Sequence, residues 1–135
     1  MARFVGRDLV VQWINSAGTV DLSADFRTLT TNEDVSDADA TAGADTYAYH
    51  LPTFTDANAD LETLDNTNHS TTYWGSIEPR LEGTLEWYPY GTVAGKPKHS
   101  MPAYISSRKQ EFPYDDVVNI TLAFQSQSAI VNSTT

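Results

Sequence analysis

The stretch VVNITLAFQ, at positions 117–125, decides the fold class. Its bulky apolar residues alternate with residues that are mostly small or polar: Val118, Ile120, Leu122 and Phe124 fall on one face. A period of two residues is that of a half-buried β-strand, because successive side chains point to opposite faces of a sheet. The alternation therefore predicts a strand that packs one face on a core.

The same period recurs upstream of this stretch. Leucine, glycine, leucine and tryptophan at 81, 83, 85 and 87 alternate with Glu82, Thr84 and Glu86. No segment has a sustained apolar stripe at helical period, and the run 59–65 fits a strand or a helix equally well. The sequence predicts an all-β sandwich or barrel with one short flanking helix. Runs rich in β-branched and aromatic residues predict further strands at 8–15, 19–23, 25–32 and 103–109.

Two neighbouring segments lack a clear pattern. Residues 34–44 are Asp, Ser, Ala, Thr and Gly with only Val35 as an apolar anchor, so we expect a loop there. Loops of this length in a small domain are usually functional or mobile. Residues 45–51 fit a short helical turn or a strand, and we expect Pro52 to end either one.

The size and composition of the chain exclude several classes of protein. Its 135 residues fit one domain spanning 1–135, and the lack of cysteine excludes disulfides and thiolate metal sites. No stretch approaches the roughly 20 apolar residues of a membrane span. The N-terminus lacks the apolar run of a signal peptide. We therefore expect a protein that stays in the cytoplasm or leaves it without a cleaved signal.

The net charge of −10 comes from one continuous segment. Residues 28–79 contain no lysine or arginine, and the rest of the chain has eight acids and eight bases. Such a segment repels phosphate, which argues against tight nucleic-acid binding. It is either a solvated acidic surface or a surface that keeps DNA from sticking. Its ten acids are Glu33, Asp34, Asp37, Asp39, Asp45, Asp56, Asp60, Glu62, Asp65 and Glu78.

The residues do not argue for an enzyme. The three histidines show no ligand spacing, and there is no Gly-x-Ser-x-Gly nucleophile motif. Acids and a threonine at every second position of 37–45 suggest oxygen ligands for calcium, but the EF-hand pattern fails at Ala42 and Ala48. Three tryptophans could form a sugar-binding platform, although the apolar face predicted for Trp87 favours core packing. We expect no catalytic residues, no cofactor and no dedicated metal site.

The order of short motifs along the chain resembles the major tail tube proteins of long-tailed bacteriophages. The resemblance covers about residues 8–131, and one extra alanine separates Gly43 from Asp45 relative to the family pattern. The matching N-terminal pieces are DLS (21–23), EDV (33–35), DAT (39–41), GAD (43–45) and YAYHLP (47–52). The matching C-terminal pieces are GTLEWYPYGT (83–92), GKPK (95–98), AYIS (103–106), PYDDVV (113–118) and LAFQ (122–125).

This resemblance implies a fold, a function and a set of partners. The family has a β-sandwich with a flanking helix, and its members form hexameric rings that stack into a hollow tube. Genomic DNA passes through the lumen without specific binding, and a length-determining protein and a terminator are further tail partners. The implied location is the virion tail, assembled in the host cytoplasm. Residues 1–7 and 131–135 are then candidate arms on neighbouring subunits.

The resemblance also suggests residues for the contacts. We expect a loop between stacked rings formed by Asp34, Val35, Asp37, Asp39, Thr41, Gly43 and Asp45. The acids first expected to face the lumen are Asp25, Glu33, Asp60 and Glu62. Two alternatives remain open. One is a related ring that does not stack, at the tail terminator, connector or baseplate hub, and the other is a monomeric β-sandwich that binds sugar or calcium.

Overall fold

The computed structural model describes residues 8–16, 18–23, 26–64, 74–92 and 94–134, and these form eight strands. None of the described helical segments is long and apolar enough to cross a membrane. The strands are β1 (Val10–Asn15), β2 (Gly18–Asp21), β3 (Phe26–Asp39), β4 (His50–Leu64), β5 (Glu82–Tyr88), β6 (Pro97–Glu111), β7 (Asn119–Ser126) and β8 (Val131–Thr134).

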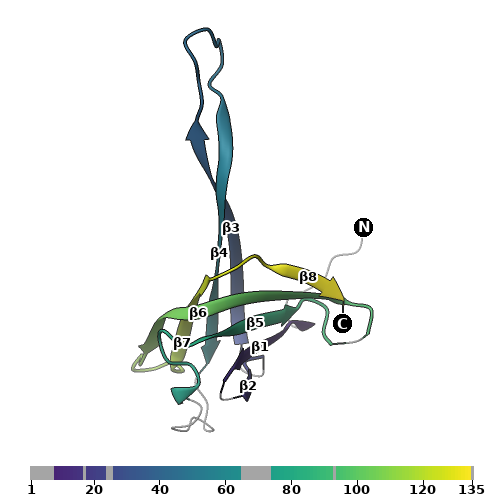
Figure 1. Cartoon of the computed structure of the whole chain (residues 1–135). Helices are drawn as coiled ribbons and strands as arrows, with labels where there is room; N and C mark the ends of the chain where they lie inside the picture. Colours follow the sequence, from purple (N-terminus) through teal and green to yellow (C-terminus); the bar gives the residue numbers. More distant parts are fainter. Residues whose placement is uncertain (1–7, 17, 24–25, 65–73, 93, 135) are drawn as a thin grey trace.

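All eight strands belong to one antiparallel sheet (Figure 1). The strand order is β2-β1-β5-β6-β7-β4-β3, and β8 pairs with the first part of β6. Residues 131–134, expected as a terminal arm, therefore lie as β8 on their own chain, while residues 1–7 and 135 lie outside the described residues.

The sheet curls around its core instead of lying flat. The rings of Trp13 on β1 and Phe124 on β7 have centroids 5.0 Å apart, although three strand spacings separate these strands in the sheet order. In a flat sheet, three spacings amount to about 14 Å. The curled sheet gives the sandwich-like, all-β architecture that the alternating patterns predict. Its buried core includes Val11, Trp13, Leu61, Leu85, Met101, Ile105, Ile120, Leu122 and Phe124.

A segment before β5 covers one end of this core. Trp74 and Gly75 are helical and are followed by turns, so the expected short helix lies here as far as it is described. Ile77 is fully buried, and the indole N–H of Trp13 donates a hydrogen bond of 3.1 Å to the carbonyl of Ser76. The guanidinium of Arg108 stacks on the Trp74 ring at 3.8 Å and donates to the Trp74 carbonyl at 2.9 Å.

The structure corrects the prediction of a loop at 34–44. Strand β3 continues to Asp39, β4 begins at His50, and the two pair along this whole length as one hairpin. Only residues 40–49 connect them. Pro52 does not end a segment but lies inside β4, opposite Asp37 and beside a register shift. A proline is tolerated there because no strand pairs with the other edge of β4 at this position in the described chain.

Candidate functional site

The most distinctive feature of the molecule is the outer part of the β3–β4 hairpin, residues 34–56, which we call the arm. Strand β7 pairs with β4 only from Asn58 to Leu64, and no described strand pairs with the free edge of β3. Beyond Asn58 the two strands therefore leave the sheet and project from the body (Figure 1). His50 lies eight positions along the strand from Asn58, which places the start of the connecting loop about 25 Å from the sheet.

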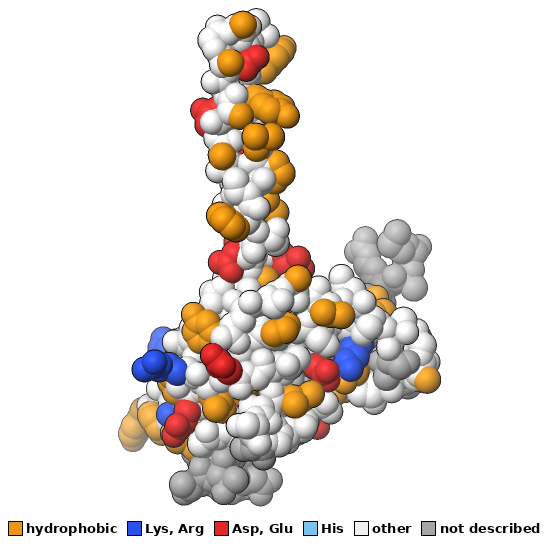
Figure 2. All heavy atoms as spheres, viewed as in Figure 1, with side chains coloured by type: hydrophobic (Ala, Val, Ile, Leu, Met, Phe, Trp, Pro, Cys, Tyr) orange, Lys and Arg blue, Asp and Glu red, His pale blue; other side chains and the backbone are white. Residues whose placement is uncertain are grey.

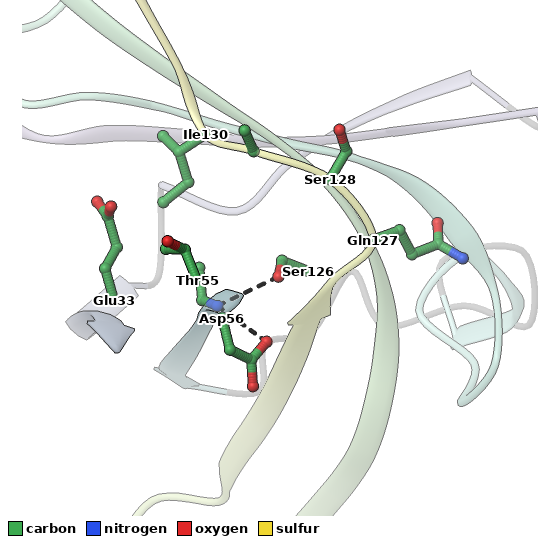
Figure 3. A pocket seen from close by; sticks show the side chains of 9 residues that line it. Glu33, Thr55, Asp56, Ser126, Gln127, Ser128 and Ile130 are labelled. Atoms are coloured by element: carbon green, nitrogen blue, oxygen red, sulfur yellow. Dashed lines mark hydrogen bonds between the residues drawn. The ribbon is translucent and has the colours of Figure 1, made fainter. Parts of the chain in front are cut away.

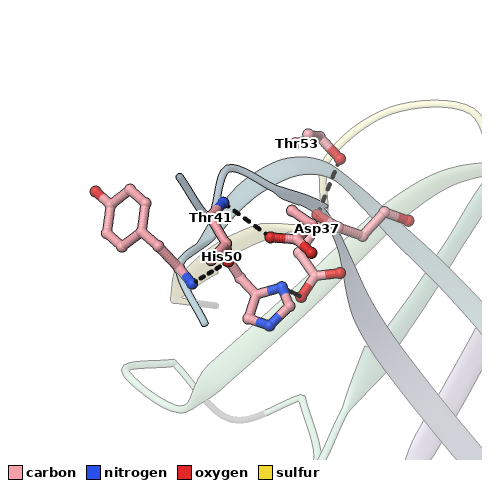
Figure 4. Close-up of polar contacts among 7 residues, drawn as sticks. Asp37, Thr41, His50 and Thr53 are labelled. Atoms are coloured by element: carbon pink, nitrogen blue, oxygen red, sulfur yellow. Dashed lines mark hydrogen bonds and ion pairs between the residues drawn. The ribbon is translucent and has the colours of Figure 1, made fainter. Parts of the chain in front are cut away.

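Local hydrogen bonds shape the end of the arm (Figure 4). The Ala40 N–H donates to the Tyr49 carbonyl at 2.7 Å, and the Tyr49 N–H donates to the Thr41 hydroxyl at 2.8 Å. Hydrogen bonds from the side chain and the backbone N–H of Thr41 hold the pKa of the Asp39 carboxyl below its ordinary value. The loop is thus ordered by its own polar groups, without a core.

A contact between a histidine and an acid joins the two strands near this end. The Nδ1 atom of His50 lies 3.4 Å from a carboxylate oxygen of Asp37, and both side chains are more than half exposed. Further along, the Thr53 hydroxyl donates to the Ser36 carbonyl at 2.9 Å. Register partners in an antiparallel pair share a face of the ribbon. Asp37, Asp39 and His50 accordingly form a polar patch on one face of the arm.

Large apolar side chains of the arm are exposed to solvent. Tyr47 is 86% exposed and Phe54 is 79% exposed. Figure 2 shows hydrophobic side chains following the arm, mostly along one side in this view. A monomeric protein rarely exposes so continuous an apolar strip, and such strips mark interaction surfaces. The large apolar residues exposed on the arm are Val35, Tyr47, Tyr49, Leu51 and Phe54.

The arm is also uniformly acidic. It carries no lysine or arginine, and His50 is its only other ionisable group of basic type. A surface that combines carboxylates with exposed aromatic rings suits a partner that offers cations beside apolar groups. The acids of the arm are Asp34, Asp37, Asp39, Asp45 and Asp56.

A groove of about 380 Å³ lies where the arm meets the body (Figure 3). Glu33, Thr55 and Asp56 line one side, and residues 126–130 line the other. The Ala57 N–H is close to both the Ser126 hydroxyl, at 3.3 Å, and the Asp56 carboxylate, at 2.9 Å. The bond to Ser126, together with the one that the Gln125 side-chain amide donates to the Asp56 carboxylate at 2.7 Å, attaches the root of the arm to the end of β7.

The acids expected to face the lumen are not brought together as a set. Asp60 and Glu62 lie on β4 facing away from the core, because they alternate with the buried Ala59, Leu61 and Thr63. Glu62 lies 3.8 Å from the Arg27 guanidinium. Glu33 lines the groove at the arm root instead, and Asp25 lies outside the described residues.

The residues expected as an inter-ring loop all lie on the arm, but in two kinds of structure. Four are in strand β3 and three in the connecting loop. The sequence did not predict that the side chains of Leu51 and Phe54, on the opposite strand β4, would be exposed on the arm. A signal for them existed, since apolar residues at 51 and 54 flank Pro52 without the alternation that marks a core strand.

Among the described residues, no three histidine or acidic side chains converge as metal ligands would. In the same part of the chain, His50 and His99 lie on different elements, at the start of β4 and on β6. His99 contacts the Asn132 amide oxygen at 2.6 Å, which helps to hold β8 in place. The described histidines therefore have structural partners on neighbouring strands.

Comparison with known proteins gives a consistent fold. No protein-family model and no curated protein sequence matches the chain. A chain in the structure of the SPP1 tail tube superposes with a TM-score of 0.79 at 11% identity, covering 98% of this chain and 80% of that one. A chain from the tail of an empty gene transfer agent particle, refined with C6 symmetry, gives 0.70 at 12% identity, covering 97% and 99%.

A third similar structure is the sheath/tube terminator of an extracellular contractile injection system, PVC, in its extended state. Its TM-score is 0.71 at 8% identity, and the match covers 98% of both chains. The chain therefore has the fold found in these tube assemblies. The predicted all-β fold of tail tube type is confirmed.

Proposed function

We propose that this protein is the structural subunit of a tail tube, in a bacteriophage or a phage-like particle, and that it assembles with copies of itself into stacked hexameric rings. The observation that carries the proposal is the arm. A two-stranded ribbon without a core is marginal in water, and this one exposes five large apolar side chains. Burial of each is worth about 1.5–3 kcal/mol before the cost of association. A neighbouring copy supplies that burial.

The edges of the sheet support lateral assembly in the same way. The strand order ends at β2 on one side and β3 on the other. Free strand edges are templates for pairing with another chain. Contact between different surfaces of identical copies closes a ring when the rotation allows it, and the ring removes both edges. The C6 symmetry of the gene transfer agent tail supports six copies per ring.

The sheet face that carries Asp60 and Glu62 is our candidate for the lumen wall. Along β4 and β7 the residues of this face alternate with the buried core residues. The face is therefore polar, and it also carries Thr121 and Gln125 of β7. Arg27 partly compensates Glu62. Lys109 on β6 shares this face opposite Thr121, but it lies 2.8 Å from Glu111, so the face offers DNA phosphates only cations that acids already pair with, and the genome slides through.

In this assignment the protein is a structural component and not a catalyst. Its partners are other copies, a length-determining protein and a terminator, and its place is the tail of the particle, built in the host cytoplasm. Residues 1–7 and 131–135 are candidates for contacts with neighbouring copies.

Negative-stain microscopy of the purified protein at high concentration tests the proposal. We expect rings of six subunits and tubes built from them. Sedimentation velocity over a concentration series gives an independent measure, because assembly is concentration-dependent. A protein that stays monomeric at every concentration and salt condition contradicts the proposal.

A ring that does not stack is the second candidate, favoured by the likeness to the sheath/tube terminator structure. The same images separate the two. Single hexameric rings that never lengthen, even with the arm intact, support the terminator-like function, whereas tubes of variable length support the tube subunit.

A further inference from the structure

The charge of the chain is segregated in a second way. Residues 87–110 contain no aspartate or glutamate but include Lys96, Lys98, Arg108 and Lys109. This segment runs from the end of β5 through most of β6. It is the counterpart of residues 28–79, which contain acids and no lysine or arginine. One chain thus carries two sequence segments of opposite charge.

The cations at the two ends of β6 differ in their surroundings. Near its C-terminal end, Lys109 lies 2.8 Å from Glu111, and Arg108 is stacked on Trp74. Both are committed to contacts within the chain. Near its N-terminal end, Lys96 is exposed and makes no ion pair with any described residue. Lys98 is held 3.2 Å from Glu86 and over the Tyr88 ring.

Exposed apolar side chains lie on the connection that carries Lys96 and on strand β8. Tyr90 is 41% exposed, and Val131 on β8 is 55% exposed. Val131 pairs with Ser100, two residues from Lys98, so their side chains are diagonal neighbours on one face. We call Tyr90, Lys96, Lys98 and Val131 the basic end of the body. Tyr90 and Lys96 lie on the connection between β5 and β6, and Lys98 lies beside Val131, so this end combines positive charge with apolar groups, the complement of the acidic and aromatic arm.

The arm cannot reach the basic end of its own chain. Beyond Asn58, β3 and β4 contact each other and diverge from the rest of the sheet. In Figure 1 the arm points away from the body, whereas β8 and the connection between β5 and β6 lie at one side of it. Any contact between the two surfaces must therefore join different copies.

We infer that the arm of one copy docks on the basic end of a second copy. The inference rests on the proposed function, since it identifies the receiving surface for the arm in a stack of rings. The acids of the arm lie against Lys96, the cation of this end that no described acid pairs with, and its apolar strip covers Tyr90 and Val131. The two surfaces are different, so each copy gives one arm and receives another, and the contact repeats along an open stack.

Charge reversal at Lys96 tests the docking. Lys96→Glu places a carboxylate against the acidic arm, and like charges facing each other across an interface cost several kcal/mol. We expect the critical concentration for tube assembly to rise at least about tenfold at low salt, equivalent to about 1.4 kcal/mol. Lys109→Glu is the matched control, because it makes the same change of charge at the other end of β6 and should leave assembly near the wild-type level.

The reciprocal change is Asp34→Lys with Asp37→Lys on the arm. This variant should also assemble poorly, and adding Lys96→Glu to it should restore assembly because attraction is re-established with both signs inverted. If Lys96→Glu assembles like the wild type, or if the triple variant assembles worse than either parent, the inference is wrong.

Crosslinking separates this inference from the proposed function. The chain has no cysteine, so Leu51→Cys and Lys96→Cys can be placed alone or together and treated with a short bis-maleimide. We expect a ladder of linked copies from the double variant and none from either single variant. A crosslinked ladder without tubes supports the docking of the arm on the basic end and contradicts the proposed tube function. Tubes without a crosslinked ladder support the tube function and contradict this docking. A Leu51→Cys/Lys109→Cys chain should give no ladder.

Discussion

Replacing Phe54 by alanine measures what the arm contributes to assembly. The side chain is 79% exposed in the single chain, so about four-fifths of its burial energy is still available to a partner copy. Full burial of a phenylalanine is worth about 1.5–3 kcal/mol. If the proposed docking buries it fully, Phe54 is therefore expected to contribute about 1.2–2.4 kcal/mol. Since 1.4 kcal/mol is tenfold, Phe54→Ala should weaken the association constant about 7- to 50-fold.

The same substitution should hardly affect folding. Only the remaining fifth of the side chain is covered within the chain, which corresponds to about 0.3–0.6 kcal/mol in the free energy of unfolding. Urea unfolding at concentrations below the onset of assembly measures this term. Pelleting of tubes over a concentration series measures the other.

Phe112→Ala is the matched control for position. Phe112 is 71% exposed, nearly as much as Phe54, but it follows β6 and is not on the arm. We expect its critical concentration to stay within about twofold of the wild type, inside the spread of surface substitutions. A folded Phe54→Ala protein that assembles at the wild-type concentration refutes the role given to the arm. If Phe54→Ala and Phe112→Ala impair assembly equally, assembly does not depend specifically on the arm.

Three further predictions concern stability, titration and salt. Gly83→Ala should lower the free energy of unfolding by about 1–3 kcal/mol, measured in urea, because a Cβ there would lie 2.3 Å from the Ile14 carbonyl oxygen and overpacking must be relieved. Asp39 should titrate below 3.8 by NMR, and Thr41→Val should raise its pKa toward that value. Because the folded pKa is lowered, the stabilisation is present above 3.8 and is lost as the pH falls through the folded pKa. The assembly defect of Lys96→Glu should shrink between about 0.05 and 1 M salt, as the Debye length falls to about 3 Å; a defect independent of salt would argue for a steric cause.

Sequence patterns predicted the body well because its strands β1, β5 and β7, and the parts of β4 and β6 within the body, each bury one face. Alternation at Leu122 and Phe124 exists since every second side chain must enter the core. The arm has no core, so nothing enforces a period of two between 34 and 44, and its strands read as a polar loop. Backbone hydrogen bonds between β3 and β4 form this ribbon, and such bonds leave little trace in the side-chain pattern.

The candidate site was predicted in part for the same reason. The acidity of this segment follows from composition, which is visible in a sequence, but its structure as a projecting hairpin does not. The outward placement of Asp60 and Glu62 did not follow from the sequence, because the run 59–65 fits a strand or a helix equally well; the structure shows it through the buried Leu61 between them. Three features depend on register and on where the hairpin leaves the sheet, which a pattern of residue types does not encode. These are the contact between Asp37 and His50, the exposure of Phe54, and the separation of Glu33 from Asp60.

The lack of a core in the arm also has an evolutionary consequence. A substitution inside the body is judged by its own chain, whose fold survives at 8–12% identity to the similar structures above. Under the proposed docking, the exposed side chains of the arm contact another copy and not their own chain, so we expect a genetic screen for folding to tolerate almost any polar replacement at 47 or 54. A screen for particle assembly would not. The contrast between two such mutational maps would outline the arm and its receiving surface without any image of the assembled particle.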